Sequence, residues 1–188
     1  MYTFRYASEA WEFEQIHRLN YQAFVEELPQ HPANPERRLI DKFHAQNTYA
    51  IGLADDQIVA MLALRNQRPF SLDAKLENLD SYLPPNRSLC EIRLLYVASA
   101  HRRGKALQGL FALVAAYGVT HAHDLALISG TTRQQRFYRH IGFVPFGPLV
   151  GTREALFQPM YLTMTTAKRY TWAFAGGEDP VLDDGAES

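Results

Sequence analysis

The stretch "LLYVASAHRRGKAL", Leu94 to Leu107, joins an apolar run to a cluster of basic residues. The apolar half predicts the end of a buried β-strand that begins at Leu89, and the periodic apolar residues that follow predict a long helix. A loop that leads from a strand into a helix presents free backbone N–H groups and the positive end of the helix dipole. This stretch therefore has the local features of a phosphate-binding loop.

The residue types in the loop support a phosphate ligand. Gly104 lets the backbone approach a phosphate because it has no Cβ, and Arg102, Arg103 and Lys105 add positive charge. Gly104 and Gly109 have the spacing of a Walker loop, but an apolar pair follows where a lysine and a Ser or Thr are required. The dinucleotide-binding pattern G-x-G-x-x-G is also absent from the loop. The alternative is an ordinary helix start that happens to be basic.

The rest of the chain predicts short strands alternating with helices. We expect strands at residues 2–7, in a hairpin at 48–65, and at 89–97, 125–129, 143–146 and 159–166. We expect helices after a Ser8 N-cap, at residues 36–46, along Leu107 to Gly118, and at 133–141. A hairpin followed by strand–helix–strand crossovers predicts an α/β (α+β) domain. Its mixed central sheet has about seven strands, with helices on both faces.

Composition sets the broad class. The chain has 188 residues, is 47% hydrophobic and carries a net charge of −1, which is typical of one globular domain without a bias toward nucleic acid or membranes. The single cysteine, Cys90, excludes an internal disulfide and favours a cytoplasmic protein. No metal-ligand spacing is present. We expect a domain over residues 1–166 and an acidic, glycine-containing tail, a disordered segment or linker, over 167–188.

Two motifs resemble those of the GNAT superfamily of N-acyltransferases. Residues 101–106, HRRGKA, resemble its acyl-CoA motif, Gln/Arg-x-x-Gly-x-Gly/Ala, except that His101 replaces Gln or Arg. About thirty residues on, "RFYRHIGFVPFG" resembles the closing helix and strand of that fold, with matches at Tyr138, Gly142 and Phe143. The resemblance implies the GNAT fold and an acyltransferase that uses acetyl-CoA or a longer acyl-CoA as co-substrate, without a metal.

The resemblance also implies which residues bind coenzyme A. Main-chain groups of one strand would pair with pantetheine, and backbone amides of the loop would hold the pyrophosphate. The residues implied are Leu95, Tyr96, Val97, Arg102, Arg103, Gly104, Lys105, Ala106 and Leu107.

Acyl transfer to an amine creates an oxyanion, which a backbone N–H near Leu95 could stabilise, and it needs a base and an acid. Glu91 is the candidate base, because a carboxylate in an apolar strand is costly to bury unless it is paired or functional. Its alternative role is a structural ion pair with Arg93 on the same strand face. Tyr138 is the candidate acid by its match to the superfamily's tyrosine, and simple packing is its alternative role.

The N-terminal half resembles a particular branch of the superfamily. "HRLNYQAFVEELPQ", residues 17–30, with Asp41, His44 and Arg65, resembles the N-acyl amino acid synthases and, more distantly, the autoinducer synthases. The sequence also resembles GNAT domains that precede class V aminotransferase domains. The synthases acylate amino acids with long chains, often taken from acyl carrier protein.

Three hypotheses follow. The first is an acyl-CoA-dependent N-acyltransferase acting on a primary amine. The second is a long-chain N-acyl amino acid synthase that uses acyl carrier protein, and the third is a catalytically silent acyl-CoA-binding module. The expected partners are a small-molecule amine or amino acid and, in the second case, the carrier protein. We expect no nucleic-acid or membrane partner, and either a monomer or a homodimer is compatible with the sequence.

Overall fold

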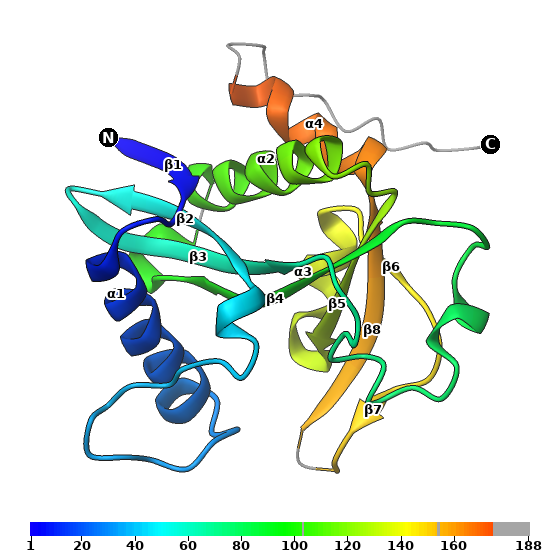
Figure 1. Ribbon diagram of the computed structural model, residues 1–188, viewed down its shortest axis with the longest axis horizontal. Helices are drawn as coiled ribbons and strands as arrows, with labels where there is room; N and C mark the ends of the chain where they lie inside the picture. The colour runs from blue at the N-terminus through cyan, green and yellow to red at the C-terminus, as the bar shows by residue number, and fades with distance from the viewer. Residues whose placement is uncertain (103, 154, 175–188) are drawn as a thin grey trace.

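The computed structural model describes residues 1–102, 104–153 and 155–174. Its centre is a mixed sheet with the strand order β1-β2-β3-β4-β5-β8-β6, and β7 pairs with β8 (Figure 1). The strands are β1 (Tyr2–Tyr6), β2 (Thr48–Ala54), β3 (Gln57–Arg65), β4 (Leu89–Val97), β5 (Leu125–Thr131), β6 (Val144–Pro145), β7 (Val150–Gly151) and β8 (Leu156–Thr163). Strands β4 and β5 are parallel, whereas the other pairs are antiparallel. The predicted mixed sheet is confirmed.

Helices cover both faces of this sheet, as predicted. Helix α1 lies on one face, and α2 and α4 lie together on the other (Figure 1). The helices are α1 (Ala10–Tyr21), α2 (Lys105–Thr120), α3 (Gln135–His140) and α4 (Met164–Phe174). Short turns of other helix types are η1 (Gln22–Glu27), η2 (His44–Gln46), η3 (Leu79–Tyr82), η4 (Ser99–His101) and η5 (Thr132–Gln134). No helix in the described part of the chain has the length and apolar character needed to cross a membrane.

The core follows the two-residue period of the strands. Along β2, Ala50 belongs to the cluster that includes α2, whereas Tyr49 and Ile51 belong to the cluster that includes Ile16 of α1. Cys90 lies fully buried on the α2 side, and burial raises the pKa of its thiol to about 12. Burial of each large aliphatic side chain contributes about 1.5–3 kcal/mol, so these two layers hold the sheet in place.

Strands β4 and β5 pair over only part of their length. The parallel ladder joins Leu89–Glu91 to Leu125–Leu127 and then stops. Beyond it, β4 contains an irregularity: Leu94 has a φ of +56°, and the register with β3 shifts between Met61 and Ala63. A non-glycine residue in that conformation costs about 1–2 kcal/mol. The distortion leaves the second half of β4 without a strand partner on the β5 side.

Two local predictions are wrong. Residues 36–46 do not form a helix, since only the 3₁₀ turn η2 is helical and Arg37 has a φ of +49°. Side chains there compete with helical hydrogen bonds, because the Asn34 amide oxygen accepts from Arg38 N–H. Ser8 is not the N-cap of α1. The Glu12 carboxylate instead accepts from the N–H groups of Ser8 and Glu9, at 2.7 and 2.9 Å.

The C-terminal elements also differ from the expectation. Strand β8 ends at Thr163, three residues before the predicted end, and α4 begins at Met164. Residues 167–174 therefore continue this helix rather than starting a tail, and Ala167 is fully buried in the core. The remainder of the expected tail, residues 175–188, lies outside the described residues.

Candidate active site

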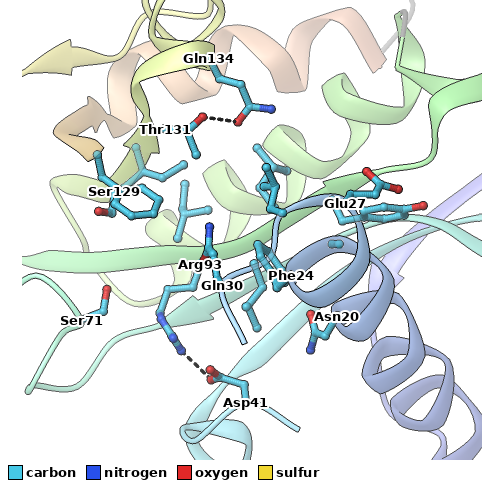
Figure 2. A pocket seen from close by; sticks show the side chains of 18 of the residues that line it. Asn20, Phe24, Glu27, Gln30, Asp41, Ser71, Arg93, Ser129, Thr131 and Gln134 are labelled. Carbon is cyan, nitrogen blue, oxygen red and sulfur yellow. Dashed lines mark hydrogen bonds and ion pairs between the residues drawn. The ribbon is translucent and has the colours of Figure 1, made fainter. Parts of the chain in front are cut away.

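A cavity of about 1020 Å³ lies where β4 and β5 separate. Its walls come from β4, β5, the end of α1 with η1, and the segments at 28–42 and 71–75. Figure 2 shows Ser129, Thr131 and Gln134 on one side of this cavity and Asn20, Phe24 and Glu27 on the α1 side. Arg93 lies between them, and Asp41, to which it is hydrogen-bonded, lies below it in this view. The cavity therefore connects the sheet opening to the N-terminal helix.

The strand residues predicted to contact pantetheine line this cavity. Leu95, Tyr96 and Val97 border it from β4, and Ile128 and Ser129 border it from β5. Because the ladder between the two strands has already ended, an extended ligand arm can lie between them.

The basic loop contributes unevenly to the cavity. Arg102 and Leu107 line it, whereas Gly104, Lys105 and Ala106 do not. Ala106 is fully buried in the core, so only its backbone can serve a ligand. Arg103 lies outside the described residues. Of the described loop residues, only Arg102 and Leu107 therefore border the cavity, and the binding of a pyrophosphate by the loop backbone stays a prediction.

Gly104 is the N-cap of α2 and has φ and ψ values of 92° and −123°. A Cβ built there would meet no atom within 4 Å, so the glycine is needed for its backbone conformation and not for lack of space. The N-terminal amides of a 16-residue helix follow directly. This geometry suits an anion next to the loop.

Arg102 and His101 make protein contacts. Arg102 donates from Nε to the Val97 carbonyl at 3.0 Å, and its Nη2 pairs with Glu27 at 3.1 Å. His101 Nδ1 lies 2.6 Å from the Tyr2 hydroxyl. Arg102 therefore links the loop to η1, and its charge is partly balanced by Glu27.

Tyr138 lines the cavity at the end that lies between β4 and β5. Its side chain is 6% exposed, and its hydroxyl donates to Gln134 Oε1 at 3.3 Å. Burial raises the pKa of this phenol to about 12, so the hydroxyl keeps its proton throughout the neutral range. Tyr138 is thus a protonated group that faces the cavity, as an acid requires.

Glu91 reaches the cavity only through a neighbour. The residue is fully buried, and its carboxylate accepts three hydrogen bonds: from Ser71 Oγ at 2.5 Å, Ser71 N–H at 2.9 Å and Leu72 N–H at 3.3 Å. Glu91 does not line the cavity, whereas Ser71 does. The expected ion pair with Arg93 is long, with Nε 3.8 Å from the carboxylate.

Arg93 pairs more closely with Asp41. Its Nη1 donates to Asp41 Oδ2 at 2.6 Å, and Asn47 and the Phe43 N–H donate to the same oxygen. Burial alone would raise the pKa of Asp41, but the hydrogen bond and charge of Arg93, with the two other donors, outweigh it and lower that pKa. The sequence singled out Asp41 but did not show its partner, which is 52 residues away.

Several polar residues that line the cavity were not among the predicted site residues, among them Asn20, Ser71 and Lys75. Lys75 Nζ lies 3.4 Å from Ser129 Oγ and 4.9 Å from the centre of the Phe157 ring. Burial lowers the pKa of this lysine even though part of the side chain remains exposed. Asn20 lies in the quoted 17–30 stretch, and Ser71 and Lys75 lie in residues 66–85, a loop whose composition predicts a role in substrate recognition, but no pattern there separates a cavity residue from an ordinary surface residue.

Several residues near the cavity serve the fold. Phe70 and Leu72 are buried with Phe146 in a separate cluster beneath the 66–88 loop. Arg65 is buried, donates to Gln46 and the Pro69 carbonyl, and lies over the Phe43 ring. Within the described residues, no group of three or more His, Cys, Asp or Glu side chains is placed to hold a metal ion.

Comparison with known proteins gives the family. The family model described as N-acyl amino acid synthase FeeM matches residues 15–166. No curated protein matches the sequence significantly. The family match favours the amino acid synthase hypothesis over transfer to an unspecified amine.

Solved structures support the same fold at low sequence identity. A CoA-dependent acyl-homoserine lactone synthase, BjaI, has a TM-score of 0.77 at 17% identity, over 93% of this chain and 90% of that one. FeeM from uncultured soil microbes has a TM-score of 0.68 at 15% identity, over 95% and 99%. A putative N-acetyltransferase from Lactobacillus plantarum has a TM-score of 0.64 at 16% identity, over 87% and 98%.

The fold is therefore the one shared by GNAT acyltransferases and autoinducer synthases. The family match covers most of the chain, including the β4 strand, the basic loop and Tyr138. The chain is an acyltransferase that belongs to the FeeM family of N-acyl amino acid synthases.

Proposed function

We propose that this protein transfers an acyl group from acyl-CoA to the α-amine of an amino acid. The observation that carries the proposal is the continuity of the cavity, which runs from the opening between β4 and β5 to the Asp41–Arg93 pair. A thioester can enter at the first end and an amino acid can bind at the second. Charged groups of both signs at the second end suit a zwitterion.

The proposed reaction is a direct attack of the amine nitrogen on the thioester carbonyl. The new N–C bond forms as the carbonyl oxygen becomes an oxyanion, for which the Leu95 backbone N–H is the proposed donor. The C–S bond then breaks, and Tyr138 gives its proton to the departing sulfur. Solvent restores that proton afterwards.

The amine must also lose a proton, and we propose that Glu91 receives it through Ser71. The Ser71 hydroxyl lines the cavity and already donates to Glu91 Oε1 at 2.5 Å. It can accept a proton from the amine while it passes its own to the carboxylate. This route explains how a carboxylate outside the cavity could act as the base.

The walls of the cavity favour an acyl chain longer than acetyl. Apolar side chains, among them Ile128, Phe137 and Phe157, border the donor end. The BjaI structures are of a CoA-dependent enzyme, and the position of Gly104 at the N-terminus of α2 supports a pyrophosphate there. Coenzyme A is therefore the proposed carrier, and acyl carrier protein is the alternative that an assay must compare.

The test is a matrix of donors and acceptors with the purified full chain. Acyl-CoAs from two to fourteen carbons are combined with amino acids and with the matching decarboxylated amines, and free thiol and N-acyl product are measured. We expect product with medium or long chains and amino acids, and little with the amines. Activity only with acetyl-CoA and simple amines would overturn the proposal, and activity only with acyl carrier protein would overturn its donor part.

A further inference from the structure

Asn20 has an unusual position in the last turn of α1. The residue is fully buried, yet it lines the cavity near Asp41 and Arg93 (Figure 2). Its Nδ2 donates to the Leu39 carbonyl at 3.3 Å, and its Oδ1 has no hydrogen-bond partner among the described residues. Since the NH₂ group must face that carbonyl, the unpartnered atom is the oxygen. A buried acceptor without a hydrogen-bond donor is costly. The unpartnered Oδ1 therefore indicates a ligand that carries an N–H or O–H group.

The charges beside Asn20 narrow the chemistry of that ligand. Leu39, which holds the Asn20 amide, is two residues from Asp41, and Asp41 holds Arg93. Arg93 has five N–H donors, of which only one makes a hydrogen bond within the described part of the chain. Its side chain also lines the cavity. An unfilled acceptor and several unfilled cationic donors therefore lie at the same end of the cavity.

The surroundings of this polar pair are apolar. Phe24, Leu28, Leu39 and Ile40 line the same end of the cavity. An amino acid with an apolar side chain matches these features. Its amine can donate to Asn20 Oδ1, its carboxylate can accept from Arg93, and its side chain can contact the apolar wall.

We propose that Asn20 recognises the acceptor, with its Oδ1 accepting a hydrogen bond from the α-amine while Arg93 holds the carboxylate. This assignment rests on the proposed function and adds its acceptor subsite and its preference for amino acids with apolar side chains. One N–H of the neutral amine binds Asn20, which leaves the nitrogen lone pair directed at the thioester. Asn20 is thus a binding residue that orients the nucleophile.

The experiment measures ligand binding by calorimetry, with coenzyme A present, so that it does not depend on turnover. The probes are leucine and 4-methylpentanoate, which lacks only the amine. The variants are Asn20→Leu and, as a matched control, His17→Leu. His17 lies one turn earlier on α1, is also buried with an unpartnered Nδ1, and does not line the cavity.

We expect Asn20→Leu to weaken leucine binding on the order of tenfold or more and to leave 4-methylpentanoate binding unchanged. His17→Leu should change neither. Equal weakening of both probes by Asn20→Leu would show a structural effect and overturn the assignment, as would unchanged leucine binding or no leucine binding to the parent protein. Parent protein that binds leucine through Asn20 but does not acylate it would instead overturn the proposed function.

Discussion

Two buried polar residues in this protein have different relations to the cavity. Tyr138 faces the cavity with a protonated hydroxyl, whereas the Glu91 carboxylate is surrounded by donors from Ser71 and Leu72. Both satisfy the rule that a buried polar group needs a partner. Only the direction of the side chain separates a group that can touch substrate from one that acts through another residue.

The first prediction concerns the proposed acid. Tyr138→Phe removes the hydroxyl and keeps the ring that packs against Phe143. We expect kcat to fall about 10²- to 10⁴-fold, because the thiolate then leaves without a proton, and the dissociation constant for acyl-CoA to stay the same. Steady-state kinetics and calorimetric titration of the donor measure the two quantities.

The dependence of the reaction rate on pH gives a second test of the role of Tyr138. Because the pKa of Tyr138 is raised to about 12, its proton is retained as pH rises through the neutral range, and the rate should show no loss from Tyr138 below about pH 11. Unchanged kcat in the phenylalanine variant would leave Tyr138 with a packing role alone.

The second prediction separates the two roles open to Glu91. Ser71→Ala removes the hydroxyl that joins Glu91 to the cavity but keeps the backbone N–H groups of Ser71 and Leu72 on the carboxylate. If the proton passes through Ser71, then Ser71→Ala and Glu91→Gln should lower kcat by similar factors, about 10²-fold or more. Stopped-flow kinetics under saturating substrates measure this step.

Thermal unfolding of the same two variants provides the control. If Glu91 only holds the 66–88 loop in place, Glu91→Gln should lower the midpoint while Ser71→Ala keeps its kcat. That pattern would contradict a catalytic role for Glu91.

At the scale of elements, the site depends on where strand pairing stops. The β4–β5 ladder ends at Glu91, and three residues later Leu94 has a positive φ, near a shift in the register between β3 and β4. Helix α2 then begins beside the opened edge with Gly104 at its N-cap. One strand thus supplies the buried carboxylate, the cavity wall and the approach to the proposed anion-binding loop.

A third prediction tests the packing between β5 and α3. A Cβ at Gly130 would lie 2.8 Å from Tyr138 Cδ2 and 2.9 Å from Cε2, closer than real side chains pack. Gly130→Ala should therefore displace the tyrosine ring and lower kcat, at a stability cost of about 1–3 kcal/mol. Kinetics and denaturant unfolding of this variant measure both effects, and a wild-type kcat would show that the ring position is not important for the reaction.

A fourth prediction concerns the loop before α2. At Gly104 there is room for a Cβ, but the φ of 92° is unfavourable for any other residue. Gly104→Ala should shift the backbone amides that face the proposed pyrophosphate, at a strain of about 1–3 kcal/mol. We expect the KM for acyl-CoA to rise on the order of tenfold with little change in kcat, which is opposite to the pattern for Gly130→Ala.

At the scale of the whole molecule, the polar groups link the N-terminal helix to the sheet. The Asp41–Arg93 pair joins the irregular 28–46 segment to β4. The centroids of the His17 and His44 rings lie 4.7 Å apart, which joins the same segment to α1. Asp41 and His17 have different pKa values in the folded and unfolded states. The stability of the fold therefore depends on pH through identifiable residues.

The fifth prediction is a stepwise loss of stability in acid. Burial, with the nearby charges of His44 and Arg38, lowers the pKa of His17 in the folded state. Its neutral form is favoured by folding, so this contribution is present above the ordinary histidine pKa of about 6.5 and is lost as pH falls below it. The lowered pKa of Asp41 adds a second loss below about pH 4.

Denaturant unfolding across pH measures these two steps. His17→Leu should reduce the first step and Asp41→Asn the second. If the parent protein keeps the same free energy of unfolding from pH 7 to pH 5, the assignment of the first step to His17 is wrong.

The sequence alone was enough to determine the mixed sheet with helices on both faces and the family resemblance, and it predicts the anion-binding loop. These features depend on local patterns: Gly104 before a helix, the two-residue period of β2 and β3, and the Tyr138–Phe143 motif. Each is set by backbone geometry within a few residues, which the amino-acid types report directly.

The tertiary structure decided which side chains meet. Glu91 and Ser71 are 20 residues apart, Arg93 and Asp41 are 52 apart, and Asn20 and Leu39 are 19 apart. In the predicted helix at 36–46, Asp41 likewise pairs with the distant Arg93. Such pairings depend on how loops close over a packed sheet, and because they join distant residues they leave no periodic pattern in the sequence.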